Sequence, residues 1–252
     1  MANWDWQVFC KNTIDGEIMS GCWGAGKDIT YLQWMMQAWG WTVSVSLVGL
    51  AIALVVGSLV GVMRTLPDSP WAVRIGNAWV ELFRNIPLLV QVFLWYFVIP
   101  KMVPVMKGFS PFVLVVFALG FFTSARIAEQ VRAGVQALPR GQRYAAMAVG
   151  FTTLQSYRYV ILPMAYRIIF PPLISESMNI FKNSAVAFAV SIPVLSQFYL
   201  QAGEETAAQG EMFLGVTALY VISAMAMNLL MTYFEKKLQI PGMVVAGGTG
   251  GH

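Results

Sequence analysis

The sequence is poor in the side chains that most catalytic and metal sites use. Among its 252 residues there is one histidine, His252, and there are two cysteines, Cys10 and Cys22. A nucleophile with its base, a metal centre or a redox centre needs such residues close together, and here they lie near opposite ends of the chain. The composition argues against an enzyme and predicts no catalytic residue and no metal site. Cys10 and Cys22 either pair, if they face an oxidising compartment, or remain two thiols.

Charged residues are also scarce. They make up 11% of the chain, against about 25% in a typical soluble domain, whereas hydrophobic residues make up 58%. This balance excludes an ordinary soluble domain and is typical of a protein that crosses a membrane several times. Nine tryptophans and nine tyrosines suit the two water–lipid interfaces of such a protein, where their amphipathic rings concentrate.

A nucleotide site is missing too, although one segment resembles one. Residues 21–28, GCWGAGKD, match the phosphate-loop pattern G-x-x-x-x-G-K up to its last position. That position requires Ser or Thr to hold magnesium, and Asp28 stands there instead. No apolar strand precedes the segment. We therefore predict that this chain binds no nucleotide.

What the sequence does contain is a series of long apolar runs. A helix needs about 20 apolar residues to cross the hydrocarbon core. Five segments qualify and predict an all-α polytopic membrane protein with these spans: Trp39–Met63, Ala78–Ile99, Pro111–Val131, a fourth from after Pro163 to about Pro193, and Met212–Phe234. The limits of the fourth span stay open because residues 183–203 carry no charge. Pro171 and Pro172 are expected to break or kink it.

Three regions follow from these spans. Residues 1–37 form an N-terminal segment outside the membrane, residues 38–236 the transmembrane domain, and residues 237–252 a glycine-rich flexible tail. Within the first span, Gly57 and Gly61 form a G-x-x-x-G pair. Such a pair either lets another helix approach closely or faces lipid.

The positive charges gather on one side of the membrane. With five spans, the first loop, the long loop near residue 145 and the C-terminus share a side, which collects eight of them: Arg64, Arg74, Arg132, Arg140, Arg143, Arg158, Lys236 and Lys237. Lysine and arginine mark the cytoplasmic side. The N-terminus is therefore expected outside and the C-terminus in the cytoplasm.

Some charged and polar residues fall inside the predicted spans, where each charge costs at least ~2.5 kcal/mol and usually serves a partner or a cavity. Glu81 and Arg84, like Glu129 and Arg132, are three residues apart and are predicted to pair on one helix face. Arg126 and Lys182 are different, because a guanidinium or ammonium group without such a partner suits a carboxylate ligand. The predicted substrate-binding residues are Ser124, Arg126, Lys182 and Ser184. The alternative for Arg126 is a pair with Glu129.

One basic, amphipathic stretch interrupts the apolar runs. Residues 140–163 read RGQRYAAMAVGFTTLQSYRYVILP. We predict a short helix, a turn at Gly150, where glycine accepts left-handed backbone angles, and a second short helix that ends before Pro163. Lying between spans at the cytoplasmic surface, this stretch is within reach of a soluble partner.

The same stretch resembles the cytoplasmic motif of permease subunits of bacterial ABC importers, which reads E-A-A, three residues, Gly, nine residues, I-x-L-P. This chain has Tyr144-Ala145-Ala146, then Gly150, then Val-Ile-Leu162-Pro163 at the same spacing. Tyr144 stands where the family usually has Glu, so an acidic contact is not available there.

A larger part of the chain, about residues 38–236, is similar to the polar amino-acid branch of these permeases. Residues 81–91, ELFRNIPLLVQ, look like its E-x-F-R-x-x-P-L-x-x-Q pattern, and residues 182–184 stand where the branch has a K-D-T-S-like run. Residues 122–132, FTSARIAEQVR, look most like glutamate/aspartate permeases. Other members usually have an apolar residue at the position of Arg126.

The resemblance implies a type I ABC importer permease fold with a cytoplasmic coupling loop, in a bacterial inner membrane and among its lipids. It implies import of polar amino acids, in particular glutamate or aspartate, by two identical or paralogous permease subunits below a periplasmic binding protein. Two cytoplasmic ATPase subunits would bind ATP and Mg, leaving no cofactor and no nucleic acid for this chain. They would grip the loop at Tyr144, Ala145, Ala146, Gly150, Leu162 and Pro163. The alternative is an ion-coupled secondary transporter or channel without an ATPase.

Overall fold

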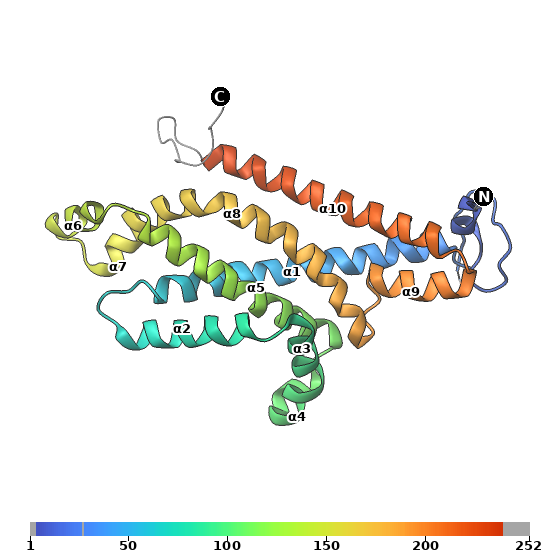
Figure 1. Ribbon diagram of the computed structural model, residues 1–252, viewed down its shortest axis with the longest axis horizontal. Coiled ribbons are helices and arrows are strands. Elements are labelled where there is room, and N and C mark those ends of the chain that lie inside the picture. Colours follow the sequence, from blue (N-terminus) through green and yellow to red (C-terminus); the bar gives the residue numbers. More distant parts are fainter. Residues whose placement is uncertain (1–3, 27, 239–252) are drawn as a thin grey trace.

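The computed structural model describes residues 4–26 and 28–238, and their regular structure is helical apart from two isolated β-bridges near the N-terminus. Figure 1 shows an elongated bundle with α6 and α7 at one end and the N-terminal segment at the other. The α-helices are α1 Tyr31–Met63, α2 Pro70–Asn85, α3 Leu88–Phe93, α4 Ile99–Met102, α5 Pro111–Gln136, α6 Arg140–Ala148, α7 Thr153–Ser156, α8 Leu162–Asn183, α9 Leu195–Thr206 and α10 Gln209–Leu238. Short 3₁₀ or π-helical turns are η1 Trp6–Cys10, η2 Leu94–Val98, η3 Pro104–Gly108, η4 Tyr157–Ile161 and η5 Ser184–Val190.

Within the described residues, three helices are each long and apolar enough to cross a membrane, and two bent helix pairs bring the number of candidate spans up to five. The three are α1, α5 and α10. The bent pairs are Pro70–Asn85 with Leu88–Met102, at 105°, and Thr153–Val190 with Leu195–Thr206, at 56°. The five predicted spans correspond to these five units, although α1 begins at Tyr31 rather than at Trp39.

The centre of the bundle is the contact between α1 and α5, which lie side by side in Figure 1. A Cβ on Gly57 would lie 2.7 Å from Ile127 Cβ, and one on Gly61 would lie 2.5 Å from Val131 Cβ. Both distances are below van der Waals contact, so only glycine lets the two helices come this close. Of the two roles left open for the G-x-x-x-G pair, the structure therefore selects helix–helix approach.

The bend between α2 and α3 follows from Pro87. A continuous helix would need an N–H at residue 87 to bond the carbonyl of Phe83, and proline has none. The Gln91 side chain supplies the substitute: its Nε2 donates to the carbonyl oxygens of Phe83, at 2.8 Å, and of Ile86, at 2.9 Å. Gln91 is buried, so these bonds satisfy backbone groups that lipid could not.

One expectation about prolines in the fourth span is wrong, and of the break or kink expected at Pro171 and Pro172 the structure excludes the break. The second short helix does not end before Pro163, because α7 continues through the π-helical turn η4 into α8, with Pro163 in the first turn of α8. Nor is the helix broken at Pro171 and Pro172, since α8 runs unbroken from Leu162 to Asn183. Both prolines are exposed, so their rings need no room in the core, and membrane helices tolerate such positions. The chain instead breaks after η5, at Ser191, which has a left-handed φ of 58°.

The N-terminal segment forms a small cap on the ends of α1, α9 and α10. A disulfide joins Cys10 and Cys22, with their Cα atoms 4.2 Å apart, which settles the alternative left open by the sequence. Phe9 lies in a hydrophobic cluster with residues of α1, α9 and α10. The backbone N–H of Asp5 donates to Glu211 Oε1 at 2.8 Å, and Lys11 donates to the Asp5 carboxylate at 2.9 Å, which lowers the pKa of Asp5.

The segment that resembles a phosphate loop lies within this cap. The Gln33 side chain accepts hydrogen bonds from the N–H groups of Gly24, at 2.7 Å, and Thr30, at 3.0 Å. At least one amide that a phosphate would need is therefore bonded to the chain itself. Lys27, and residues 239–252 of the predicted tail with His252, lie outside the described residues.

We expect loss of the disulfide to loosen the cap without unfolding the bundle. The Cys10→Ser/Cys22→Ser variant removes a crosslink across a loop of 12 residues, worth about 3 kcal/mol in chain-entropy terms. Limited trypsin digestion should then cut at Lys11 roughly 100-fold faster, because a free-energy difference of about 3 kcal/mol changes the population of the opened cap by about that factor. Cleavage next to Lys236 and Lys237 is the internal control and should be unchanged. Equal rates at Lys11 in both proteins would show that packing alone holds the cap.

Candidate functional site

A polar cavity of about 340 Å³ lies within the membrane-spanning part of the chain. It is lined by Arg84 from α2, by Phe122, Arg126, Glu129 and Gln130 from α5, and by Glu176 from α8. The four α5 residues follow one another at intervals of four, three and one, which places them on one helix face. One face of α5 thus turns charged and polar side chains towards a cavity.

Arg126 and Glu176 form an ion pair in this cavity. Arg126 Nε lies 3.2 Å from Glu176 Oε2, and the Glu176 side chain is 8% exposed while that of Arg126 is 41% exposed. A carboxylate so far from solvent needs its cation. The guanidinium keeps its exposed side free for a second anion. The alternative that paired Arg126 with Glu129 is wrong.

Glu129 is already held by two other arginines. It pairs with Arg132, as predicted, and also accepts a hydrogen bond of 2.6 Å from Arg64 Nη1. Arg64 Nε donates to Asn77 Oδ1 at 2.8 Å, so the cluster ties together α1, α2 and α5. The pairing predicted for Glu81 and Arg84 is wrong: among the residues described, no ion pair joins them, and Arg84 lines the cavity instead.

Of the four predicted substrate-binding residues, only Arg126 lines this cavity. Ser124 is buried, accepts a hydrogen bond from Trp79 Nε1 at 3.1 Å and donates to the Phe121 carbonyl. Ser184 is also buried and donates to the carbonyl of Phe181 at 2.7 Å. Lys182 is exposed and lies outside the cavity lining. The structure therefore does not bring these four together.

Sequence reasoning missed Glu176 and Gln130 as cavity residues. Glu176 lies 50 positions from Arg126, so no local spacing indicated the pair. The one feature of the sequence that could have indicated Glu176 is that it is an acidic residue inside an apolar span, because such residues usually face a partner or a cavity. The Gln130 side-chain oxygen is buried and finds no hydrogen-bond partner among the residues that the structure describes. The cavity thus offers guanidinium donors, which suit the carboxylate groups of a small ligand.

A second candidate site is the end of the bundle formed by α6 and α7 (Figure 1). Helix α6 ends at Ala148, and the predicted turn follows at Gly150, whose φ is +87°. The N–H of Phe151 bonds the Ala146 carbonyl at 3.1 Å, and the N–H of Gly150 bonds that of Met147 at 3.0 Å. These two bonds make a Schellman motif, which requires the left-handed angle that glycine provides.

Helix α7 starts directly after this turn and is tied to the rest of the bundle. Thr152 and Gln155 form a reciprocal capping box. The Tyr157 hydroxyl donates to the Thr65 carbonyl at 2.6 Å, and Thr153 Oγ1 donates to Asp68 at 3.2 Å. The loop between α1 and α2 therefore holds the α6–α7 turn in place.

The outer surface of this turn is apolar. Tyr144 is 65% exposed, Val149 74% and Leu154 78%. Ala145 and Pro163 are exposed and Leu162 is half-buried, whereas Ala146 packs inward. Exposed apolar residues grouped in this way mark an interaction surface. We call Tyr144, Met147, Val149, Phe151 and Leu154 the outer patch.

The comparisons with known proteins agree with one another. The model of a family described as "Binding-protein-dependent transport system inner membrane component" matches residues 49–240. The glutamate/aspartate import permease protein GltJ of Escherichia coli (strain K12) is 40% identical over 253 residues, covering 95% of this chain and 97% of that one. The probable glutamine ABC transporter permease protein GlnM of Bacillus subtilis (strain 168) is 35% identical, covering 79% and 90%. A crystal structure of an amino acid ABC transporter with histidines superposes with a TM-score of 0.71 at 26% identity, covering 82% and 95%.

Proposed function

This chain belongs to the family of inner membrane components of binding-protein-dependent transport systems, and we propose that it forms the translocation pathway for glutamate and aspartate. Its fold is the all-α, multi-pass fold of type I ABC importer permeases, and its place is the inner membrane. Amino-acid import by an ABC system is the function that it serves with partner subunits.

The observation that carries the choice of substrate is the half-exposed guanidinium of Arg126 in the polar cavity. An acidic amino acid brings two carboxylates and one ammonium group. Arg126 and Arg84, which both line the cavity, would bind its carboxylates. The 40% identity to a glutamate/aspartate permease supports the same substrates.

Coupling to separate ATPase subunits is the second part of the proposal. The outer patch supports it, because an exposed apolar surface on a rigid turn fits a groove on a soluble partner. Tyr144, Ala145 and Gly150 would form this contact, with Leu162 and Pro163 joining the turn to α8. Two such ATPases would bind ATP and Mg, and a second permease subunit and a periplasmic amino-acid-binding protein would complete the importer.

The proposed orientation puts the N-terminal cap outside and the α6–α7 end in the cytoplasm. The Cys10–Cys22 disulfide supports an oxidising side for the cap, since such bonds persist outside the cytoplasm. Arg140, Arg143 and Arg158 support the cytoplasmic side for the other end. Residues 1–37 would then be the periplasmic segment and residues 237–252 a cytoplasmic tail.

Uptake by the assembled importer tests the function directly. We expect proteoliposomes that contain this chain, its partner permease, the ATPase and the binding protein to accumulate labelled glutamate only when ATP is supplied. Collapsing the proton and sodium gradients with ionophores should leave the rate unchanged. Gradient-driven uptake by this chain without an ATPase would instead establish an ion-coupled transporter or channel.

A further inference from the structure

A second cavity, of about 500 Å³, lies between α6 and the ends of α1 and α5. Three arginines line it, Arg64, Arg140 and Arg143, and no aspartate or glutamate does. Apolar side chains line it as well: Leu66, Val135, Leu138 and Ile161. A cavity of this size is within the usual range for small-molecule sites, and its lining suits a ligand that is anionic at one end and apolar at the other.

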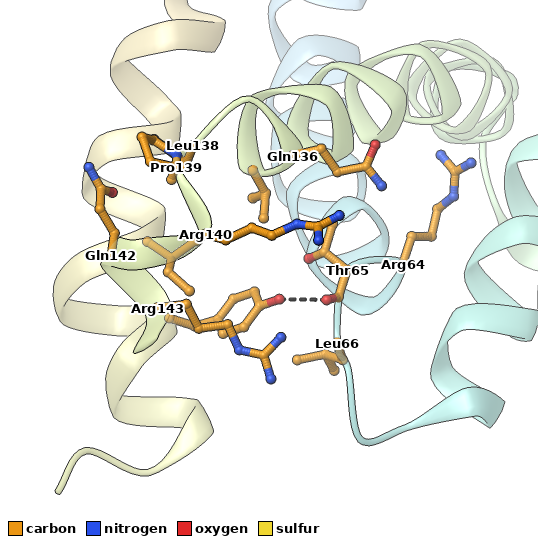
Figure 2. A pocket seen from close by; sticks show the side chains of 12 residues that line it. Arg64, Thr65, Leu66, Gln136, Leu138, Pro139, Arg140, Gln142 and Arg143 are labelled. Carbon is orange, nitrogen blue, oxygen red and sulfur yellow. Dashed lines mark hydrogen bonds between the residues drawn. The ribbon is translucent and has the colours of Figure 1, made fainter. Parts of the chain in front are cut away.

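Two of these arginines have no partner in the described part of the chain. Figure 2 shows the side chains of Arg140 and Arg143 reaching from α6 across the cavity towards Thr65 and Leu66. No hydrogen bond or ion pair within residues 4–26 and 28–238 engages either guanidinium. Arg64 differs, because Glu129 and Asn77 hold its head group. The free positive charge in the cavity therefore comes from Arg140 and Arg143.

The position of the cavity separates it from both candidate sites described above. It lies between α6 and the ends of α1 and α5, whereas Tyr144 and Met147 of the outer patch are exposed and do not line it. The ends of two membrane-spanning helices, α1 and α5, form its other walls. Helix ends of this kind lie at the depth of the lipid head groups.

We propose that this cavity binds the head group of an anionic phospholipid, with Arg140 and Arg143 contacting its phosphate. Guanidinium groups form paired, charge-assisted hydrogen bonds to phosphate. Basic pockets between membrane helices on the cytoplasmic side are suited to such head groups. Leu66, Leu138 and Ile161 provide the apolar wall that the glycerol and first acyl carbons need, which inorganic phosphate would leave unused. The Tyr157–Thr65 hydrogen bond of 2.6 Å keeps η4 against the end of α1 and so keeps the cavity formed.

Lipid titration of the purified full-length chain tests this proposal independently of transport. The probe is a short-chain phosphatidylglycerol, measured by native mass spectrometry in neutral detergent, with phosphatidylcholine and inorganic phosphate as comparison ligands. We expect saturable binding of phosphatidylglycerol. The Arg140→Gln/Arg143→Gln variant should bind it roughly 30-fold more weakly, since each basic residue near a membrane surface contributes on the order of a five-fold effect.

The matched control is Arg74→Gln/Arg158→Gln, which also removes two positive charges, one near the start of α2 and one in η4. These two arginines lie outside the cavity lining and stack on Trp71 and Tyr159. The control should bind within about three-fold of the unchanged protein on the same electrostatic reasoning. The Arg140→Lys/Arg143→Lys variant, which keeps the charge, should retain most of the binding. Melting temperatures of all variants verify that each one is folded.

Three results would overturn the lipid assignment. Equal binding of phosphatidylglycerol by the unchanged protein and by Arg140→Gln/Arg143→Gln would remove the role of the two arginines. Displacement of the lipid by inorganic phosphate at matching concentrations would make the site one for free anions. Loss of ATPase retention in the glutamine variant with unchanged lipid binding would assign the arginines to a protein contact instead. Failure of glutamate transport, in contrast, would affect only the function proposed earlier.

Discussion

Replacing Gly150 by aspartate is expected to abolish ATP-driven transport while the membrane helices stay folded. The φ of +87° at this position costs a residue with a Cβ about 1–2 kcal/mol. The strained turn would open the two hydrogen bonds that end α6, and the outer patch would lose its shape. Uptake and substrate-stimulated ATP hydrolysis of the assembled importer should both fall to background, and retention of the ATPase during purification should fall with them.

Two further substitutions separate backbone strain from added charge. Gly141→Asp puts the same charge on α6 at an exposed glycine whose Cβ would meet nothing within 4 Å, so it should keep most of the transport activity. Gly150→Asn has nearly the same shape as Gly150→Asp and, like it, adopts left-handed angles more readily than most residues, so any activity that it keeps beyond Gly150→Asp measures the effect of the charge. Full activity of Gly150→Asp would refute the assignment of this turn to coupling.

The second large effect is expected at Arg126. Replacing it by glutamine would remove the proposed charge-assisted bond to the substrate, worth roughly 2 kcal/mol or more, and should raise the apparent KM for glutamate about 30-fold or more. The substitution also strands Glu176, which is 8% exposed, and an unpaired buried charge destabilises by about 3–5 kcal/mol. A single variant therefore cannot distinguish substrate binding from a structural role.

The double variant Arg126→Gln/Glu176→Gln distinguishes them, because it removes both charges of the pair at once. If Arg126 only neutralises Glu176, the double variant should regain normal uptake. If Arg126 binds substrate, the apparent KM should stay about 30-fold raised although the protein is stable again. Glu176→Gln alone serves as the control, and it should bind glutamate at least as well as the unchanged chain because it frees Arg126.

The features that the sequence predicted well depend on local rules. The turn at Gly150 could be predicted because a left-handed residue after a helix is usually glycine. The pairing of Glu129 with Arg132 could be predicted because residues three apart share a helix face. The close approach at Gly57 and Gly61 was left as one of two alternatives. Its resolution needed the partner residues Ile127 and Val131, which lie on another helix.

The features that the sequence did not predict depend on contacts between helices. Arg126 and Glu176 are 50 residues apart, and Arg64 and Glu129 are 65 apart, so neither pair leaves a spacing pattern. Ser124 was expected beside Arg126 because it is near in sequence, yet two positions along a helix point in different directions. The general rule that proline ends a helix failed at Pro163, because a π-helical turn precedes it and the helix continues.

The Gln91 side chain has a mechanical consequence for the whole α2–α4 segment. The two carbonyls that it bonds lie on one side of the bend, at Phe83 and Ile86, while its own backbone lies on the other. Straightening the segment would break both bonds and gain none at Phe83, because Pro87 has no N–H to offer. The angle between α2 and α3 is therefore held fixed, and the bend does not act as a hinge. Any displacement of α2 should therefore move α3 and α4 with it as one rigid unit.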